Sequence, residues 1–136
     1  ITNVDKPPLD FLSIDERVEA LRREDANRLI VLTRAPTFIE KANLFPGATF
    51  VAGVDTIERV AEPRYYGGDA ALRDAALTEI ARLRCRFLVF GREVNGKFMT
   101  LGDLNLPVEL HRICDEVPAG DYREDVSSTD LRKGAP

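Results

Sequence analysis

Three short apolar segments, rich in β-branched and aromatic residues, constrain the fold of this chain most strongly. They are residues 28–33 (RLIVLT), 48–54 (ATFVAGV) and 86–91 (RFLVFG). Each is a nearly continuous hydrophobic run of strand length, bounded by turn or helix signals, which is typical of strands buried on both faces of a parallel sheet. These runs predict three parallel strands of one sheet.

Helical patterns alternate with the predicted strands. Residues 13–23 begin with Ser13 and carry Glu16 three residues later, a capping box that precedes an amphipathic pattern. Residues 69–84 begin with Asp69 as an N-cap and repeat apolar side chains at helical spacing. Alternating strands and helices, joined by right-handed crossovers, predict an α/β fold: a three-layer, doubly wound parallel sheet with helices on both faces.

Length and composition limit the classes of protein to which the chain can belong. Its 136 residues, 44% of them hydrophobic, predict a single domain over residues 1–136. A net charge of −4 provides no overall positive field, so we expect neither a nucleic acid nor a membrane as partner. No membrane-spanning run or signal segment is recognisable, which predicts a cytoplasmic protein. The sequence leaves open whether the domain forms a homo-oligomer.

The beginning of the sequence resembles the middle of a domain. The first residue is Ile1, and residues 1–4 read like the end of a strand. We therefore expect the chain to be the C-terminal part of a longer domain, whose first strand lies upstream.

Histidine and cysteine are too sparse for a metal site built from these residues. His111 is the only histidine, which excludes a two-histidine motif within this chain. Cys85 and Cys114 lack the spacing of metal ligands, so we expect two buried free thiols. An acidic loop is expected to be solvated, with a weaker alternative role at Mg²⁺; it contains Asp121, Glu124 and Asp125.

A candidate phosphate site lies near the C-terminus, in residues 126–134 (VSSTDLRKG). Ser127, Ser128 and Thr129 stand at an expected helix start, and Arg132 follows within one turn. Backbone N–H groups, hydroxyl donors and the helix dipole favour an anion there, and an arginine adds a bidentate clamp. The alternative is an ordinary helix cap, because a Ser followed three residues later by Asp also fits a capping box.

Ligands of parallel α/β sheets bind beyond the carboxyl ends of the strands. Gly53 and Asp55 follow one predicted strand. Gly53 is expected either to let a ligand approach the backbone or to form a tight turn. Asp55 is expected either to contact a ligand or to be the N-cap of a helix over residues 56–60.

Two cations complete the candidate binding residues. Arg92 ends the strand over residues 86–91, where it can meet an anionic ligand or pair with a carboxylate such as Glu93 or Asp103. Lys6 lies among prolines in an expected extended loop, a setting that is also typical of a solvated surface lysine.

Several motifs together resemble the nucleotidyltransferase superfamily. The segment SSTDLR resembles the S-S-T-x-[IL]-R signature found in nicotinamide and nicotinate mononucleotide adenylyltransferases. Residues 50–56 resemble that family's strand ending in G-x-D, and residues 87–92 its later strand ending in Arg. Residues 3–17 are similar to its segment after the second strand. The stretches NVDKPPLDF, TRAPTFIEKANLFPGATFVAGVDT and PRYYGG are similar to a cytidylyltransferase-like branch.

The resemblance implies a Rossmann-like nucleotidyltransferase fold and a reaction. An adenylyl or cytidylyl group would pass from ATP or CTP to a phosphate-bearing acceptor such as a mononucleotide, with release of pyrophosphate and with Mg²⁺ accompanying the nucleotide. It also implies that Gly53 and Asp55 contact the sugar region of the nucleotide. The SSTDLR segment would hold phosphate.

The sequence differs from the family in one motif, and this difference leaves two hypotheses about function. The family's first strand leads into a G-x-F-x-P-x-H-x-G-H motif, whose histidines stabilise the transferring phosphoryl group, and this sequence contains no such motif. Phosphoryl transfer depends on positioning and charge stabilisation, so the loss should remove most of the catalysis. The chain is then either part of a transferase or a non-catalytic nucleotide-binding or regulatory domain.

Overall fold

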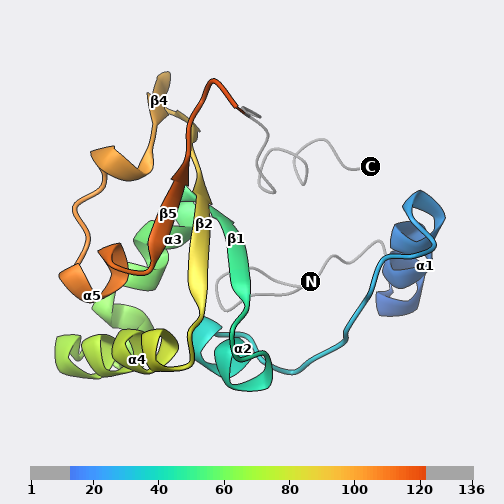
Figure 1. Cartoon of the computed structure of the whole chain (residues 1–136), viewed down its shortest axis with the longest axis horizontal. Coiled ribbons are helices and arrows are strands. Elements are labelled where there is room, and N and C mark those ends of the chain that lie inside the picture. Colours follow the sequence, from blue (N-terminus) through green and yellow to red (C-terminus); the bar gives the residue numbers. More distant parts are fainter. Residues whose placement is uncertain (1–12, 122–136) are drawn as a thin grey trace.

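A three-stranded parallel sheet forms the centre of the protein (Figure 1). The computed structural model describes residues 13–121. The strand order is β1-β2-β5, with β1 at Thr49–Gly53, β2 at Arg86–Phe90 and β5 at Cys114–Val117. Phe50 of β1 lies beside Phe87 of β2, which in turn lies beside Cys114 of β5. The described chain is thus a mixed α/β structure, compatible with a Rossmann-like fold.

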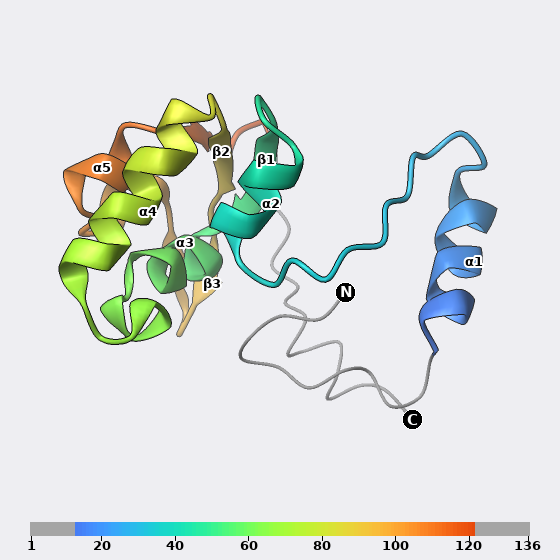
Figure 2. The ribbon, with the colours of Figure 1, turned by 90° about the horizontal axis from the view of Figure 1, so that it is seen from below.

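Helices pack against one face of this sheet. Figure 2, which looks along the strands, shows α2, α3 and α4 on the same side of the sheet. The helices are α1 (Ile14–Glu24), α2 (Phe38–Leu44), α3 (Val54–Ala61), α4 (Ala70–Arg82) and α5 (Val108–His111), with short 3₁₀ turns at Pro63–Tyr66 and Leu101–Asp103. An antiparallel hairpin of β3 (Arg92–Val94) and β4 (Lys97–Met99) follows β2. No helix within residues 13–121 is long and apolar enough to cross a membrane.

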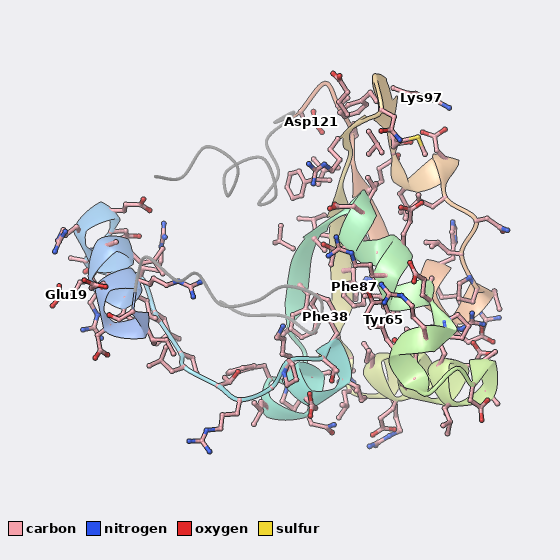
Figure 3. The ribbon with its side chains drawn as sticks, turned by 180° about the vertical axis from the view of Figure 1, so that it is seen from behind. Glu19, Phe38, Tyr65, Phe87, Lys97 and Asp121 are labelled. Atoms are coloured by element: carbon pink, nitrogen blue, oxygen red, sulfur yellow. The ribbon has the colours of Figure 1, made fainter. Side chains whose placement is uncertain are left out.

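The core lies between the sheet and these helices. Phe87 is completely buried and meets the Phe38 ring of α2 edge-on, with the ring centroids 5.0 Å apart. Figure 3 shows these two side chains between helix and strand. Leu77 and Ile80 of α4 are also buried. Alternation along the strands places Phe50 and Ala52 on the same face as Phe87, so the apolar runs do supply a core.

The opposite face of the sheet is partly exposed. It carries Val51, which is 67% exposed, together with the half-buried Leu88 and Phe90. An exposed ion pair also lies on this face, with Arg86 Nε 2.7 Å from Asp115 Oδ2. Within residues 13–121 no helix covers this face, so the described part of the chain has helices on one face of the sheet only, and the three-layer arrangement stays a prediction.

Residues 28–33 require a correction of the sequence prediction. They form no strand but an extended link between α1 and α2, in which Leu29, Val31 and Leu32 are 87%, 51% and 65% exposed. A strand exists only when its backbone groups find a neighbouring strand, and β propensity mainly measures how side chains fit a pleated, half-buried surface. Residues 28–33 thus have the composition of a strand, but no neighbouring strand pairs with them within the described residues.

The two predicted helices are confirmed, but their surroundings differ. In α1, Ser13 N–H donates to Glu16 Oε2 at 2.7 Å and Glu16 N–H to Ser13 Oγ at 3.1 Å, a complete capping box. In α4, Asp69 accepts from the N–H groups of Ala71 and Leu72. Whereas α4 packs into the core, α1 buries no residue and lies away from the sheet (Figure 1).

Candidate functional site at the carboxyl edge of the sheet

The carboxyl ends of β1 and β2 lie side by side, because Gly53 pairs with Phe90 in the parallel register. From Gly53 the chain passes directly into α3, and from Phe90 it passes through Gly91 into β3. The first residues after both strands therefore meet at one edge. This is the edge where ligands of parallel α/β sheets bind.

Arg92 and Asp55 form an ion pair at this edge. Arg92 Nη1 donates to Asp55 Oδ2 at 3.0 Å, and the two side chains are only 17% and 33% exposed. The sequence suggested Glu93 or Asp103 as partners for this arginine. Asp103 instead accepts the backbone N–H of Thr100 at 2.9 Å, within the capping box of a 3₁₀ turn whose N-cap is Thr100.

Asp55 lies inside the first turn of α3 and is not its N-cap. The helix begins at Val54, ahead of the expected start at residue 56, and its N-cap is Gly53, which offers no side-chain bond. A carboxylate in a first helical turn is stabilised by the positive end of the helix dipole. Asp55 thus faces both this partial charge and the guanidinium of Arg92.

Gly53 is required by space rather than by backbone conformation. Its φ of −81° is available to any residue. A Cβ atom there would lie 2.8 Å from Asp55 Oδ1 and 3.8 Å from the Cδ atom of Arg92. The glycine thus brings the backbone against the ion pair, and the structure joins three separately predicted residues into one cluster. We call Gly53, Asp55 and Arg92 the edge cluster.

The β3–β4 hairpin closes one side of this edge, and the sequence interpretation missed it. A Cβ atom on Gly91 would lie 2.7 Å from the carbonyl oxygen of Met99 and 2.8 Å from the Phe98 ring, so the hairpin crosses tightly over the end of β2. The sequence does contain a signal for this hairpin, because Asn-Gly at residues 95–96 favours a two-residue hairpin turn. In the structure both residues have the positive φ values that such a turn requires, 51° and 78°.

A cavity of about 320 Å³ lies between α3 and the hairpin. Its apolar walls come from Val54, Val94, Met99 and Leu104, and Glu58 and Lys97 add charge. Val54 stands between Gly53 and Asp55 in the chain, but none of the three residues of the edge cluster lines the cavity.

The other predicted site residues are distributed as follows. Ser127, Ser128, Thr129, Arg132 and Lys6 lie outside the described residues, as do Glu124 and Asp125. Asp121 is exposed at the same end of the molecule as Lys97 (Figure 3). His111 is exposed at the end of α5, which precedes β5, so it lies toward the amino edge of the sheet.

The two thiols are free, and they differ in burial. Cys85 is buried, as expected, and Cys114 is only half-buried. Partial burial, supported by the negative charge of Asp115, raises the pKa of Cys114 to about 11, while Arg86 opposes the shift. Across residues 13–121 there is no group of three or more His, Cys, Asp or Glu side chains that could hold a metal ion.

No protein-family model, curated protein or solved structure matches this chain significantly.

Proposed function

We propose that this chain is a nucleotidyltransferase-type α/β domain that binds a nucleotide, ATP or CTP, over the carboxyl edge of its sheet. The observation that carries the proposal is the edge cluster. Its three residues come from two neighbouring strand ends, at the edge where such folds bind ligands. The arginine bonds to the carboxylate, and the glycine leaves no room for a Cβ atom beside that carboxylate.

Arg92 is the anion-binding group of the proposal. The protein is acidic overall, so a polyphosphate must be held by a local concentration of positive charge. A guanidinium presents five N–H donors in a planar fork. The bond from Nη1 to Asp55 fixes the orientation of this fork, and a phosphate can then bind bidentately to its outer side.

Gly53 and the start of α3 complete the phosphate and sugar contacts. Without a Cβ atom, the backbone at Gly53 can approach a ligand closely. The first N–H groups of α3 point toward the same edge and carry the positive end of its dipole. Asp55 can accept a ribose hydroxyl with the carboxylate oxygen that does not bind Arg92, in agreement with the contact to the sugar region that the family resemblance implies.

The nucleotide is proposed as the donor in adenylyl or cytidylyl transfer to a phosphate-bearing, mononucleotide-like acceptor. Mg²⁺ would accompany the nucleotide and be held mainly by its phosphate oxygens, as is usual for this ion. Ser127, Ser128, Thr129 and Arg132 are proposed as the second phosphate contact, and Lys6 as a further cation.

Binding without turnover is the second candidate, and the position of His111 favours it. The only histidine of the chain lies toward the amino edge of the sheet, whereas the edge cluster lies at the carboxyl edge. The described residues therefore offer groups that bind an anion but no histidine to stabilise a transferring phosphoryl group. Such a domain would bind nucleotide and serve a regulatory role.

The test compares two arginines that stand near the two ends of β2. We expect Arg92→Ala to weaken the binding of MgATP or MgCTP by roughly tenfold to a hundredfold, because a hydrogen bond to a charged group contributes about 1.5–3 kcal/mol. Arg86→Ala removes an exposed pair with Asp115 at the amino end of β2 and should leave affinity unchanged. Isothermal titration calorimetry of both variants and the parent measures the difference. Equal nucleotide affinities in the three proteins would mean that the Arg92–Asp55 pair is only a structural ion pair and does not bind nucleotide.

A further inference from the structure

The PRYYGG stretch, to which the proposed site gives no role, lies at the carboxyl end of α3. Its residues Pro63–Tyr66 form a 3₁₀ turn that ends at Gly67, whose φ of 70° lies in the left-handed region. The Tyr66 hydroxyl donates to the carbonyl oxygen of Val60, six residues earlier, at 2.9 Å. The turn thus returns one side chain to the last turn of the helix that precedes it.

A second side chain reaches the same end of α3 from α4, which lies beside it (Figure 2). Arg73 Nη1 donates to the carbonyl oxygen of Ala61 at 3.0 Å, and the arginine side chain is only 17% exposed. Asp74 holds the same guanidinium, with its Oδ1 2.9 Å from Arg73 Nε. The last carbonyls of a helix have no donor within the helix. Two of them are bonded here by side chains from outside α3.

Charge and protonation state suit both bonds. A cation at the carboxyl end of a helix is stabilised by the negative end of the helix dipole. Burial raises the pKa of Tyr66 above its ordinary value, and the nearby charge of Arg73 opposes this shift. The hydroxyl therefore keeps the proton that it donates. We call Tyr66 and Arg73 the α3 clamp.

The amino end of α3 is held differently. Its N-cap is Gly53, which offers no side-chain bond. Asp55, in the first turn, bonds to Arg92, which belongs to β3. The α3 clamp and the edge cluster therefore lie at opposite ends of one short helix.

We propose that the α3 clamp positions the nucleotide site: Tyr66 and Arg73 fix the place of α3 along its axis and thereby hold Asp55 within bonding distance of Arg92. This role rests on the proposed function, in which Asp55 and Arg92 bind the nucleotide. Tyr66 and Arg73 touch no ligand themselves and act through Asp55.

The geometry of α3 connects its two ends. Asp55 precedes Val60 by five residues, about 7.5 Å along a helix axis. Hydrogen bonds between successive turns make such a short helix move as one body. A shift of about 1 Å along the axis is enough to lengthen the 3.0 Å bond between Arg92 and Asp55 beyond hydrogen-bonding range.

Packing against the sheet does not fix this shift. Ile57 and Val60 are the buried contacts of α3 beyond its first turn, and apolar contacts are not directional. The two bonds of the α3 clamp are directional, and their donors belong to the PRYYGG turn and to α4. They therefore select one position of the helix among those that burial permits.

A double-mutant cycle tests the α3 clamp without nucleotide. Tyr66→Phe removes only the hydroxyl of the clamp, and Asp55→Asn removes the charge that pairs with Arg92. Urea unfolding of the parent, the two single variants and the double variant gives the stability of each protein. We expect the double variant to lose less than the sum of the two single losses, because the Arg92–Asp55 pair is already displaced once the clamp is broken.

Asp115→Asn is the matched control for this cycle. It makes the same chemical change in the Arg86–Asp115 pair, to which α3 contributes no residue. Its loss should therefore add to that of Tyr66→Phe. Arg73→Ala should give the same two patterns as Tyr66→Phe. Losses that add for Asp55→Asn as well would show that the clamp only stabilises α3, and would overturn the proposal.

Nucleotide titration gives the functional readout. We expect Tyr66→Phe to weaken the binding of MgATP or MgCTP by about threefold to tenfold, the equivalent of one displaced hydrogen bond. In an Asp55→Asn background the same substitution should have no further effect, and an equal loss in both backgrounds would contradict a role through Asp55. A parent that binds neither nucleotide would refute the proposed function, whereas the unfolding cycle would still decide whether the α3 clamp positions Asp55.

Discussion

At the scale of single residues, two glycines of this protein are required for different physical reasons. Gly53 has an ordinary φ but no room for a Cβ atom beside Asp55. Gly47 has open space around it, but its φ of +79° lies in the left-handed region. The first glycine is therefore a feature of the site, and the second is a feature of the backbone.

Replacement of each glycine by alanine should separate these roles. Gly53→Ala displaces the Asp55 carboxylate, so we expect weaker nucleotide binding with little change in the urea midpoint. Gly47→Ala should lower the free energy of unfolding by about 1 kcal/mol and leave affinity unchanged, because alanine is strained at positive φ. Calorimetric titration and urea unfolding of both variants test the contrast. If Gly53→Ala binds nucleotide with unaltered affinity, Gly53 does not belong to the binding site.

The raised pKa of Cys114 predicts how the stability of the folded chain depends on pH. Partial burial raises its pKa to about 11 in the folded chain, whereas an unfolded cysteine ionises near about 8.5. Between these values the unfolded chain holds fewer protons than the folded one, so this contribution to stability is present below pH 8.5 and is lost as the pH rises through 11. We expect Cys114→Ala to lose less stability than the parent between pH 8 and pH 10.5. If urea unfolding shows that the parent and Cys114→Ala lose the same free energy of unfolding over this pH range, the raised pKa is contradicted.

At the scale of secondary-structure elements, the same capping box begins two helices with different surroundings. Ser13 and Glu16 form it in α1, and Thr37 and Glu40 form it in α2. α2 buries Ala42 completely and packs Phe38 on Phe87, whereas α1 buries nothing in the described chain. An identical local motif therefore contributes to global stability only where its helix belongs to the core.

Alanine substitution in the two caps should show this difference. Thr37→Ala should lower the free energy of unfolding by about 0.5–2 kcal/mol, the usual cost of a lost N-cap. Ser13→Ala should have little effect on global unfolding, because α1 buries no residue and frays independently of the sheet. Because the chain contains no tryptophan, urea titrations followed by circular dichroism measure the stability of both variants. Equal losses in the two variants would mean that α1 packs against the rest of the protein.

At the scale of the whole molecule, the positions of the charged groups determine which activity the isolated chain can have. Arg92 and Asp55 meet at the carboxyl edge, and His111 lies toward the amino edge. The charged pair of the proposed nucleotide site and the single histidine thus lie toward opposite edges of the sheet.

We therefore expect the isolated chain to bind nucleotide without appreciable turnover. A pyrophosphate-release assay with MgATP or MgCTP and mononucleotide acceptors should give a rate no higher than that of Arg92→Ala. Sustained pyrophosphate release that Arg92→Ala abolishes would show that the edge cluster performs the transfer itself.

The sequence by itself determined much of the local structure and the mixed α/β class. Capping boxes, Asp caps and apolar spacing specify α1 and α4, because these signals act within a few residues of chain. The runs at β1 and β2 were predicted for the same reason. The positions of Gly53, Asp55 and Arg92 followed from their location just beyond strand ends, a property that the chain order already contains.

Only the tertiary structure decided which strand-forming segments become strands and which charges meet. Residues 28–33 have strand composition but remain extended and exposed, because a strand requires a neighbour that local sequence cannot supply. Arg92 pairs with Asp55, 37 positions away, rather than with a carboxylate close to it in sequence. The parallel register of β1 and β2 brings these two side chains together, and this long-range pairing is set by burial across the whole sheet.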